Sequence, residues 1–329
     1  MKKMINITDC SFDTERYRDG AEVADAVQKL GFDGLELMHC QGYEPDFFLP
    51  GSVIGVHLRC KNEWVDLWKG DMKALEREYD TLEQAAEVFG GLDRESLLAP
   101  LREDLELARR LGASYVVFHV SDVKMTELFS YTFRHTDEEV VDAAAEVINT
   151  LLDGQGYEFE FLMENLWWPG LTMTRPEITE RLFAAVHYSK KGIMLDTGHL
   201  MHTNLELRSE EEAIDYIKEQ VLAHGEMARN IRGIHLNQSI TGDYVKRLLS
   251  RQSEMPENHR ERVNVCYNHV FQIDRHLPFS TPRVRELTEL VQPEYLTFEF
   301  ITESRKEHEK KLRQQMEALY DDLSVAGRR

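Results

Sequence analysis

The feature that most restricts what this chain can fold into is a series of eight short apolar runs, which are separated by stretches with helical periodicity. The runs cover residues 4–8, 34–38, 54–58, 115–120, 159–164, 192–196, 231–236 and 296–300. Intervening segments such as residues 21–31 and 101–112 place apolar residues at helical spacing and stop at a glycine. Strands that alternate with helices predict a parallel sheet, and eight such units close a barrel. We therefore predict the α/β class and a (β/α)8 barrel.

The length of 329 residues fits one barrel domain that spans residues 1–329. Two connections exceed the usual loop length: residues 71–100 after the third strand and residues 239–270 after the seventh. We interpret both insertions as functional loops or short lids. Further helices are predicted over residues 137–154, with Asp137 as the N-cap, and at about 303–324 near the C-terminus.

Six consecutive predicted strands, the third to the eighth, end in a residue that can bind a metal ion. These residues are His57, His119, Glu164, Asp196, His235 and Glu299. In a closed parallel barrel the carboxyl ends of all strands face one mouth, so side chains remote in sequence converge there. A divalent cation turns the mutual repulsion of buried carboxylates into coordination. Because imidazole and carboxylate ligands are mixed, we predict one to three ions of Zn²⁺ or Mn²⁺.

Three more candidate ligands lie in loops that follow these strands. His199 comes three residues after Asp196, where it is either a second ligand or a substrate contact. Asp274 and His276 are two residues apart, so they share one side of an extended backbone. Together with the strand ends they give nine candidate ligands, more than one metal ion requires.

Aromatic and acidic residues near the same mouth are candidate substrate contacts. Trp167 and Trp168 follow Glu164, and Trp64 follows His57, so they could form an aromatic wall suited to the face of a sugar, or simply pack in the core. Glu36 ends the second strand, where it is either a substrate contact or a carboxylate on the rim.

The composition of the chain limits which partners and which cellular compartment we expect for it. The net charge of −20 argues against nucleic acid, although a local basic patch would override it, and favours a small-molecule substrate. The chain has no apolar run of about 18 residues, so no membrane span is predicted. Four cysteines without a C-x-x-C pair indicate reduced thiols, including buried ones at Cys10 and Cys40, and a cytoplasmic protein. A homodimer is the prior for a barrel of this size.

Seven segments occur in an order that resembles a known superfamily. They are FDGLEL, HVS, MENLWWPG, LDTGHL, IHLN, DRH and FEF, and they extend over roughly residues 4–300. They resemble the xylose isomerase-like TIM barrels, which include sugar isomerases and epimerases and the endonuclease IV proteins (AP endonuclease family 2). The resemblance implies a shared metal site at Glu164, Asp196, His235 and Glu299, with His199 nearby. It also implies that His57, His119, Asp274 and His276 match the additional ligands of the multi-zinc endonucleases.

Two classes of enzyme follow from this ligand set. The leading hypothesis is a metal-dependent isomerase or epimerase of a sugar or related polyhydroxy carbonyl compound. Glu164 and Glu299 would exchange a proton through an enediolate, and His199 would position the substrate. The alternative is a multi-zinc phosphoester hydrolase that acts on abasic-site DNA or a small phosphoester. The segments LRCKNEWVDLW, NLWWPG and LPFST depart from the endonuclease pattern and argue against DNA. A non-catalytic metal-binding or sugar-binding barrel is a third, weaker reading.

Overall fold

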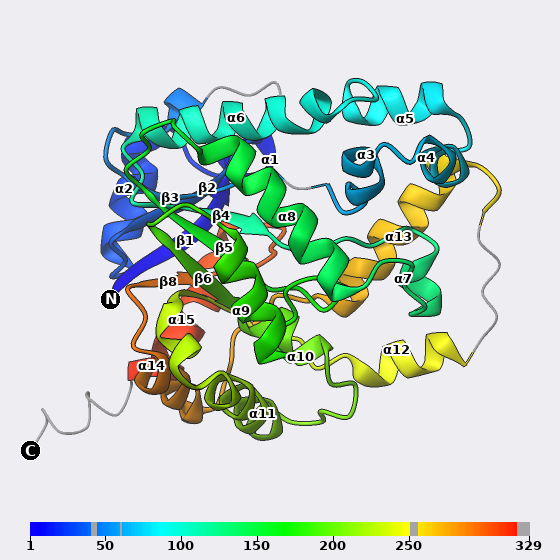
Figure 1. Ribbon diagram of the computed structural model, residues 1–329. Helices are drawn as coiled ribbons and strands as arrows, with labels where there is room; N and C mark the ends of the chain where they lie inside the picture. The colour runs from blue at the N-terminus through cyan, green and yellow to red at the C-terminus, as the bar shows by residue number, and fades with distance from the viewer. Residues whose placement is uncertain (41–44, 60, 251–255, 321–329) are drawn as a thin grey trace, which may run out of the picture.

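The computed structural model describes residues 1–40, 45–59, 61–250 and 256–320. Eight parallel strands form a closed barrel in sequence order (Figure 1). The strands are β1 (Lys2–Thr8), β2 (Gly34–Met38), β3 (Val53–His57), β4 (Tyr115–His119), β5 (Glu160–Glu164), β6 (Lys191–Asp196), β7 (Ile231–Leu236) and β8 (Tyr295–Phe298). Each predicted strand is present with its ends shifted by two residues at most, so the (β/α)8 barrel is confirmed.

Helices connect the strands and surround the barrel (Figure 1). They are α1 (Ser11–Thr14), α2 (Gly20–Lys29), α3 (Val65–Lys69), α4 (Met72–Tyr79), α5 (Leu82–Phe89), α6 (Arg94–Leu111), α7 (Glu127–Ser130), α8 (Asp137–Leu152), α9 (Pro176–Ala185), α10 (Thr197–His202), α11 (Glu210–Ala223), α12 (Gly242–Leu249), α13 (His259–Ile273), α14 (Arg285–Val291) and α15 (Arg305–Tyr320). Three short 3₁₀ turns add η1 (Pro45–Phe47), η2 (Gly225–Asn230) and η3 (Pro282–Val284). None of these helices is long and apolar enough to cross a membrane.

The start of α8 differs from the sequence prediction by one residue. Thr136, not Asp137, is the N-cap, because its hydroxyl accepts a hydrogen bond from the Glu139 amide at 3.2 Å. The Glu139 carboxylate accepts a bond from the Thr136 amide in return, at 3.1 Å. This reciprocal capping box satisfies two amides that the helix leaves without partners. Asp137 instead accepts a bond from the Gly170 amide in the loop after β5.

Large side chains fill the interior of the barrel. Met4, Tyr115, Leu162 and Met194 are fully buried and belong to one apolar cluster. The β-carbon of any other residue at Gly55 would come within 2.2 Å of the Tyr115 ring, so the close approach of β3 to that ring requires glycine. The barrel is therefore a packed core, and its chemistry is confined to the mouth.

The two long connections are largely helical. Residues 71–100 contain α4, α5 and the start of α6, and residues 239–270 contain α12 and most of α13. Figure 1 shows α4 and α5 (cyan) beside α13 at one side of the barrel. Arg262 of α13 forms an ion pair with Asp80 at 2.7 Å, and Gln84 of α5 hydrogen-bonds His259 at 3.0 Å. The predicted extension of the last helix to residue 324 lies outside the described residues.

The prediction of reduced thiols at Cys10 and Cys40 is wrong, because these two cysteines form a disulfide. The barrel explains the pairing: β1 and β2 are neighbours, with Thr8 opposite Met38, and each cysteine lies two residues beyond its strand. Their Cα atoms are 5.8 Å apart, within the range that a disulfide spans. A separation of 30 residues in sequence does not reveal this adjacency.

Candidate metal centre

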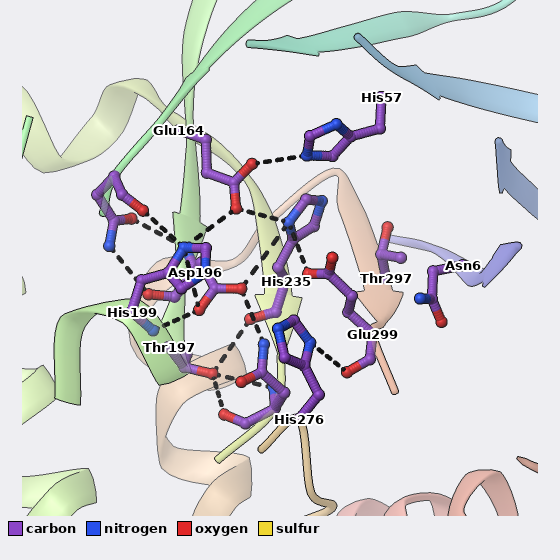
Figure 2. Close-up of polar contacts among 12 residues, drawn as sticks. Asn6, His57, Glu164, Asp196, Thr197, His199, His235, His276, Thr297 and Glu299 are labelled. Carbon is purple, nitrogen blue, oxygen red and sulfur yellow. Dashed lines mark hydrogen bonds and ion pairs between the residues drawn. The ribbon is translucent and has the colours of Figure 1, made fainter. Parts of the chain in front are cut away.

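The nine predicted ligands converge at the mouth of the barrel and form three groups. Figure 2 shows the ligands His57, Glu164, Asp196, His199, His235, His276 and Glu299. The first group is His57, His119 and Glu164; the second is Glu164, Asp196, His235 and Glu299; the third is His199, Asp274 and His276. Within each group one donor atom per residue lies within 4.8 Å of the others. The sequence predicted a single cluster, and the structure divides it into three groups, the first two of which share Glu164.

Glu164 joins the first two groups through its two separate oxygens. Its Oε2 lies 3.1 Å from His57 Nε2 and 3.2 Å from His119 Nε2. Its Oε1 lies 3.0 Å from His235 Nδ1 in the second group. The side chain is fully buried at the end of β5. Glu164 therefore offers one oxygen to each of two candidate ligand groups.

His235 is the centre of the second group. Its Nδ1 faces Glu164 Oε1 and Glu299 Oε2, each at 3.0 Å, and Asp196 Oδ2 at 3.9 Å. Its Nε2 lies 2.9 Å from Glu36 Oε1. One ring nitrogen carries at most one proton, so Nδ1 cannot donate to all the carboxylates that it faces. A cation among these atoms satisfies all of them at once.

The third group lies beside the second, on loops after β6 and β7. Asp274 Oδ2 is 2.7 Å from His276 Nε2 and 3.3 Å from His199 Nε2. His202 also contacts Asp274, through Oδ1 at 3.4 Å. His276 has a φ angle of 43°, a left-handed conformation that costs about 1–3 kcal/mol in a residue other than glycine. This strain is consistent with a ring held in place for function.

Backbone carbonyl oxygens hold the outward-facing nitrogens of three of these rings. His57 Nδ1 bonds Leu58 O at 3.0 Å, and His199 Nδ1 bonds Asn165 O at 2.9 Å. His276 Nδ1 bonds the carbonyl oxygen of Glu299 at 3.1 Å. A carbonyl oxygen accepts only, so each Nδ1 carries a proton and donates, and Nε2 is the nitrogen that faces the group. Metal-binding histidines are held in this way.

The segment Asp196-Thr197-Gly198-His199 connects β6 to α10 and supplies two groups with ligands. Asp196 Oδ1 accepts a bond from the His199 amide at 2.6 Å and so caps α10, while its Oδ2 accepts from Asn237 Nδ2 at 2.8 Å. A β-carbon at Gly198 would lie 1.9 Å from Asn237 Oδ1, so glycine is required there. This packing fixes Asp196 at the point where its remaining lone pairs face the second group.

Buried charges raise the pKa of groups in the centre. Burial raises the pKa of the Asp196 carboxyl to about 7. Burial by itself would lower the pKa of His199, but Asp196 and Asp274 raise it to about 9. The pKa of His276 likewise rises to about 10, against burial, because Asp274 faces its ring. The carboxylates therefore favour positive charge on the two imidazoles beside them.

The donor set fits divalent cations. Throughout the described ranges, every ion-pair partner of the carboxylates in these groups is a histidine, and no lysine or arginine neutralises them. Imidazole nitrogens with carboxylate oxygens suit Zn²⁺ and related transition metals. The three groups would hold such ions without any change of residue.

The family model described as xylose isomerase-like TIM barrel matches residues 24–321. The chain belongs to this family. Its members are mostly enzymes, among them sugar isomerases and epimerases and endonuclease IV-like enzymes.

Solved structures share the fold of this family member. A putative xylose isomerase from Rhodospirillum rubrum ATCC 11170 has a TM-score of 0.54 at 12% identity and covers 97% of this chain and 98% of its own. The IOLI protein with a bound zinc atom has a TM-score of 0.53 at 13% identity, over 99% of both chains. A D-tagatose 3-epimerase-like protein has a TM-score of 0.51 at 14% identity, over 98% of this chain and all of that one. At these identities the likeness extends to the fold alone. No curated protein matches the chain in sequence.

In this member of the xylose isomerase-like family, Glu36 is not a rim carboxylate. It is buried on β2 and bonds His235 at 2.9 Å, Tyr115 Oη at 2.6 Å and Thr297 Oγ1 at 2.9 Å. Its position beneath His235 makes it the residue that orients this ring, which the sequence prediction did not consider.

The predicted aromatic wall divides into two parts. Trp167 packs against Trp168, with ring centroids 4.1 Å apart, and against His199 at 5.3 Å. Trp64 lies on the other side of the centre, where its Nε1 donates to Ser121 O at 2.8 Å. Trp64 and His119 both line a cavity of about 450 Å³. All three tryptophans are buried, so they shape the walls of the centre more than its open rim.

Sequence reasoning missed three residues of the centre. Asn165 pairs with the backbone of Asp196 through both amide atoms, at 2.9 and 3.0 Å, and Asn237 holds the Asp196 carboxylate. His202, which is not among the predicted ligands, is buried against Asp274. The two asparagines directly follow Glu164 or lie two residues after His235, a proximity that could have identified them.

Proposed function

We propose that this protein is a multinuclear metal-dependent phosphoester hydrolase. The arrangement of Glu164 carries the proposal, because its two oxygens face two different ligand groups. Paired cations a few ångströms apart are the arrangement that stabilises both the attacking and the leaving oxygen of a phosphoryl group. A third group, on His199, Asp274 and His276, extends this set. The presence of three candidate ligand groups, where one metal ion needs only one, is the observation that ranks hydrolysis above isomerisation.

Bound divalent cations would supply Lewis acidity toward the phosphoryl oxygens. The protein residues supply the rest. Glu164 contributes an oxygen to each of the first two groups and so holds them next to each other. Glu36 fixes the orientation of His235. Trp167 and Trp168 exclude water from the side of the third group. The low-dielectric surroundings strengthen each of these electrostatic contacts.

A small phosphoester is the substrate class that we favour. His119 of the first group lines the cavity of about 450 Å³, whose size is that of a small-molecule site. Lys61 also lines this cavity and would contact a phosphate group, whereas Arg59 in the same wall is already paired with Asp104 and Glu103, each at 2.9 Å. The net charge of −20 opposes the approach of a nucleic-acid backbone. The cavity therefore suits one phosphorylated small molecule.

Isomerisation of a sugar is the second candidate, and a specific observation favours it. The second group, with Glu164, Asp196, His235 and Glu299, is a complete four-ligand set without the other two groups. Glu164 and Glu299 stand on either side of His235 Nδ1, as a proton-exchanging pair requires. His199, next to this set, would position the substrate.

The substitution Glu164→Gln tests the proposed hydrolase. It keeps the size of the side chain but removes the bridging charge, so we expect zinc content to fall by at least one equivalent per chain from about three. Hydrolysis of p-nitrophenyl phosphate or its bis-ester should fall by more than about 100-fold, beyond the loss typical of residues outside the ligand shell. Elemental analysis and absorbance assays measure both effects.

Glu160→Gln is the matched control. Glu160 begins the same strand and pairs with Arg232 at 2.9 Å, away from the mouth, so its replacement should leave zinc content and hydrolysis unchanged. A wild-type protein that holds one metal ion, cleaves neither ester and incorporates deuterium from heavy water into a ketose would overturn the hydrolase in favour of the isomerase.

A further inference from the structure

A second set of metal-binding side chains lies beyond β1 and β2, the two strands that contribute no ligand to the three groups. We define the rim cluster as Asp9, Cys10, His39 and Cys40. Asp9 and Cys10 directly follow β1, and His39 and Cys40 directly follow β2. Thr8 and Met38 pair in the parallel ladder, so the two dipeptides leave the barrel side by side.

The members of the rim cluster are in direct contact. Asp9 Oδ1 accepts a bond from the Cys40 amide at 2.7 Å, and Asp9 Oδ2 contacts His39 Nδ1. Cys10 and Cys40 are joined by the disulfide. Donor atoms of Asp9, Cys10 and Cys40 all lie within 4.8 Å of one another. Three potential ligands from two chain segments thus meet at one point, and His39 lies beside them in contact with Asp9.

The chemistry of these side chains matches zinc. Two thiolates, one imidazole and one carboxylate are four donors, the number that a tetrahedral zinc site requires. Bonds of about 2.3 Å to zinc place two thiolate sulfurs roughly 3.8 Å apart, a separation that side-chain rotation provides between Cα atoms 5.8 Å apart. Asp9 is buried, so it is already desolvated as a ligand, and its contact with His39 keeps that ring at the cluster.

We propose that the rim cluster binds one zinc ion once its disulfide is reduced. A dithiol reductant donates two electrons and two protons: its own sulfurs join in a new disulfide, the Cys10–Cys40 bond breaks, and two thiols form. Zinc then displaces both thiol protons to solvent, because the thiolate is the form that binds metals. Disulfide and zinc exclude each other, so the oxidation state decides whether the site exists.

Titration with Co²⁺ gives a signal that cannot come from the three ligand groups at the mouth. Those groups contain no cysteine, whereas Co²⁺ bound to thiolates absorbs in the near ultraviolet by charge transfer. The full-length protein is reduced with a dithiol, freed of reductant and metal under argon, and titrated with Co²⁺. We expect a charge-transfer band that saturates at about one equivalent and disappears when zinc is added. The oxidised protein should show no such band.

Single variants assign the band to the rim cluster. Cys10→Ser and Cys40→Ser should abolish it, and His39→Ala should weaken zinc binding by about 10-fold or more. Cys266→Ser is the control, because Cys266 is buried on α13 and bonds Met125 O, so the band should persist. Cys60 is retained in every variant, so a band due to Cys60 would survive in all of them. Circular dichroism verifies that each variant is folded.

Two results would overturn the proposal. One is a reduced wild-type protein whose cobalt spectrum lacks the charge-transfer band. The other is a band that remains after Cys10→Ser in a folded protein. Neither result bears on the hydrolase, because the metal content and activity of the mouth groups are measured separately.

Discussion

At the scale of single residues, the metal centre depends on how each histidine divides its two nitrogens. His57, His199 and His276 each bond a backbone carbonyl oxygen through Nδ1 and present Nε2 to a ligand group. His235 is reversed: it bonds Glu36 through Nε2 and presents Nδ1. These outer partners fix the orientation of each ring before any ion is present, so the rings need little rotation when a cation is bound.

Gly198→Ala tests how tightly the ligands are packed. A β-carbon there would lie 1.9 Å from Asn237 Oδ1, so Asn237 must move and its bond to Asp196 at 2.8 Å is lost. We expect the free energy of unfolding to fall by about 1–3 kcal/mol from overpacking, together with a loss of zinc affinity. Urea titration measures the first effect and a competitive zinc chelator the second.

Gly31→Ala separates strain from ligand geometry. Gly31 has a φ angle of 82°, and the nearest atom to an added β-carbon is the end of Met316 at 3.8 Å. This variant should lose about 1–2 kcal/mol through its left-handed backbone and keep its zinc affinity. If both variants had the same zinc affinity as the wild type, Gly198 would matter for folding alone.

At the scale of elements, the insertions after β3 and β7 form one body beside the barrel. Arg262 of α13 bonds Glu78 O at 2.8 Å and pairs with Asp80 at 2.7 Å, both at the end of α4. Lys124, Asp66 and His135 form a second buried polar network beneath α3. Paired charges of this kind hold the insertion in a single arrangement as long as each keeps its partner.

Glu63, just before α3, is an acidic residue whose ionised form is unfavourable in the folded chain at neutral pH. Burial and the nearby Glu78 raise the pKa of Glu63 from 4.5 to about 7. The folded chain therefore holds one more proton than the unfolded chain between pH 4.5 and 7, and this contribution to stability is lost as the pH rises through that range. Glu63→Gln should stabilise the protein by about 1–2 kcal/mol at pH 8 and by much less at pH 5.

Urea unfolding of the metal-free wild type and of the variant, at pH 5 and at pH 8, measures the gain in stability at each pH. The titration of all other groups is the same in both proteins and cancels when the two free energies of unfolding are subtracted. Glu87→Gln, on α5 in the same insertion, is the comparison, and we expect it to change stability equally at pH 5 and pH 8. A Glu63→Gln protein with the same gain at both pH values would show that Glu63 keeps an ordinary pKa in the folded chain.

At the scale of the whole molecule, barrel closure brings together ligands from six consecutive strands and their loops. The ligand groups therefore link elements that local contacts do not connect, from His57 on β3 to Glu299 just after β8. An ion bound among them stabilises the closed barrel, because the unfolded chain does not bring the ligands together.

Removal of metal should consequently lower the melting temperature of the entire protein. A zinc concentration of 100 times the Kd adds about 2.7 kcal/mol to folding. Dialysis against a chelator should lower Tm by several degrees, and stoichiometric zinc should restore it. Asp274→Asn should show a smaller response, because the third group is impaired. A Tm that is independent of zinc in the wild type would show that these groups do not bind the ion.

The sequence was a good guide to the elements and to the identity of the ligands. All eight strands follow from local apolar runs, and His57, His119, Glu164, Asp196 and His235 end strands where predicted. The sequence did not predict the contacts that side chains make between neighbouring strands. Cys10 and Cys40 were predicted as thiols, and Glu36 was assigned to the rim or the substrate, because the distance between neighbouring strands is not visible in the spacing along one chain.

The sequence alone thus determined the alternation of strands and helices, since periodicity of apolar residues is a local property of the backbone. It also determined which residues with metal-binding side chains end the strands. Only the tertiary structure decided how these side chains divide into three groups, two of which share Glu164, which residues hold them in place, and that two cysteines meet. Those outcomes depend on barrel closure, strand register and the direction of each side chain, and all three are set by packing between segments far apart in the sequence.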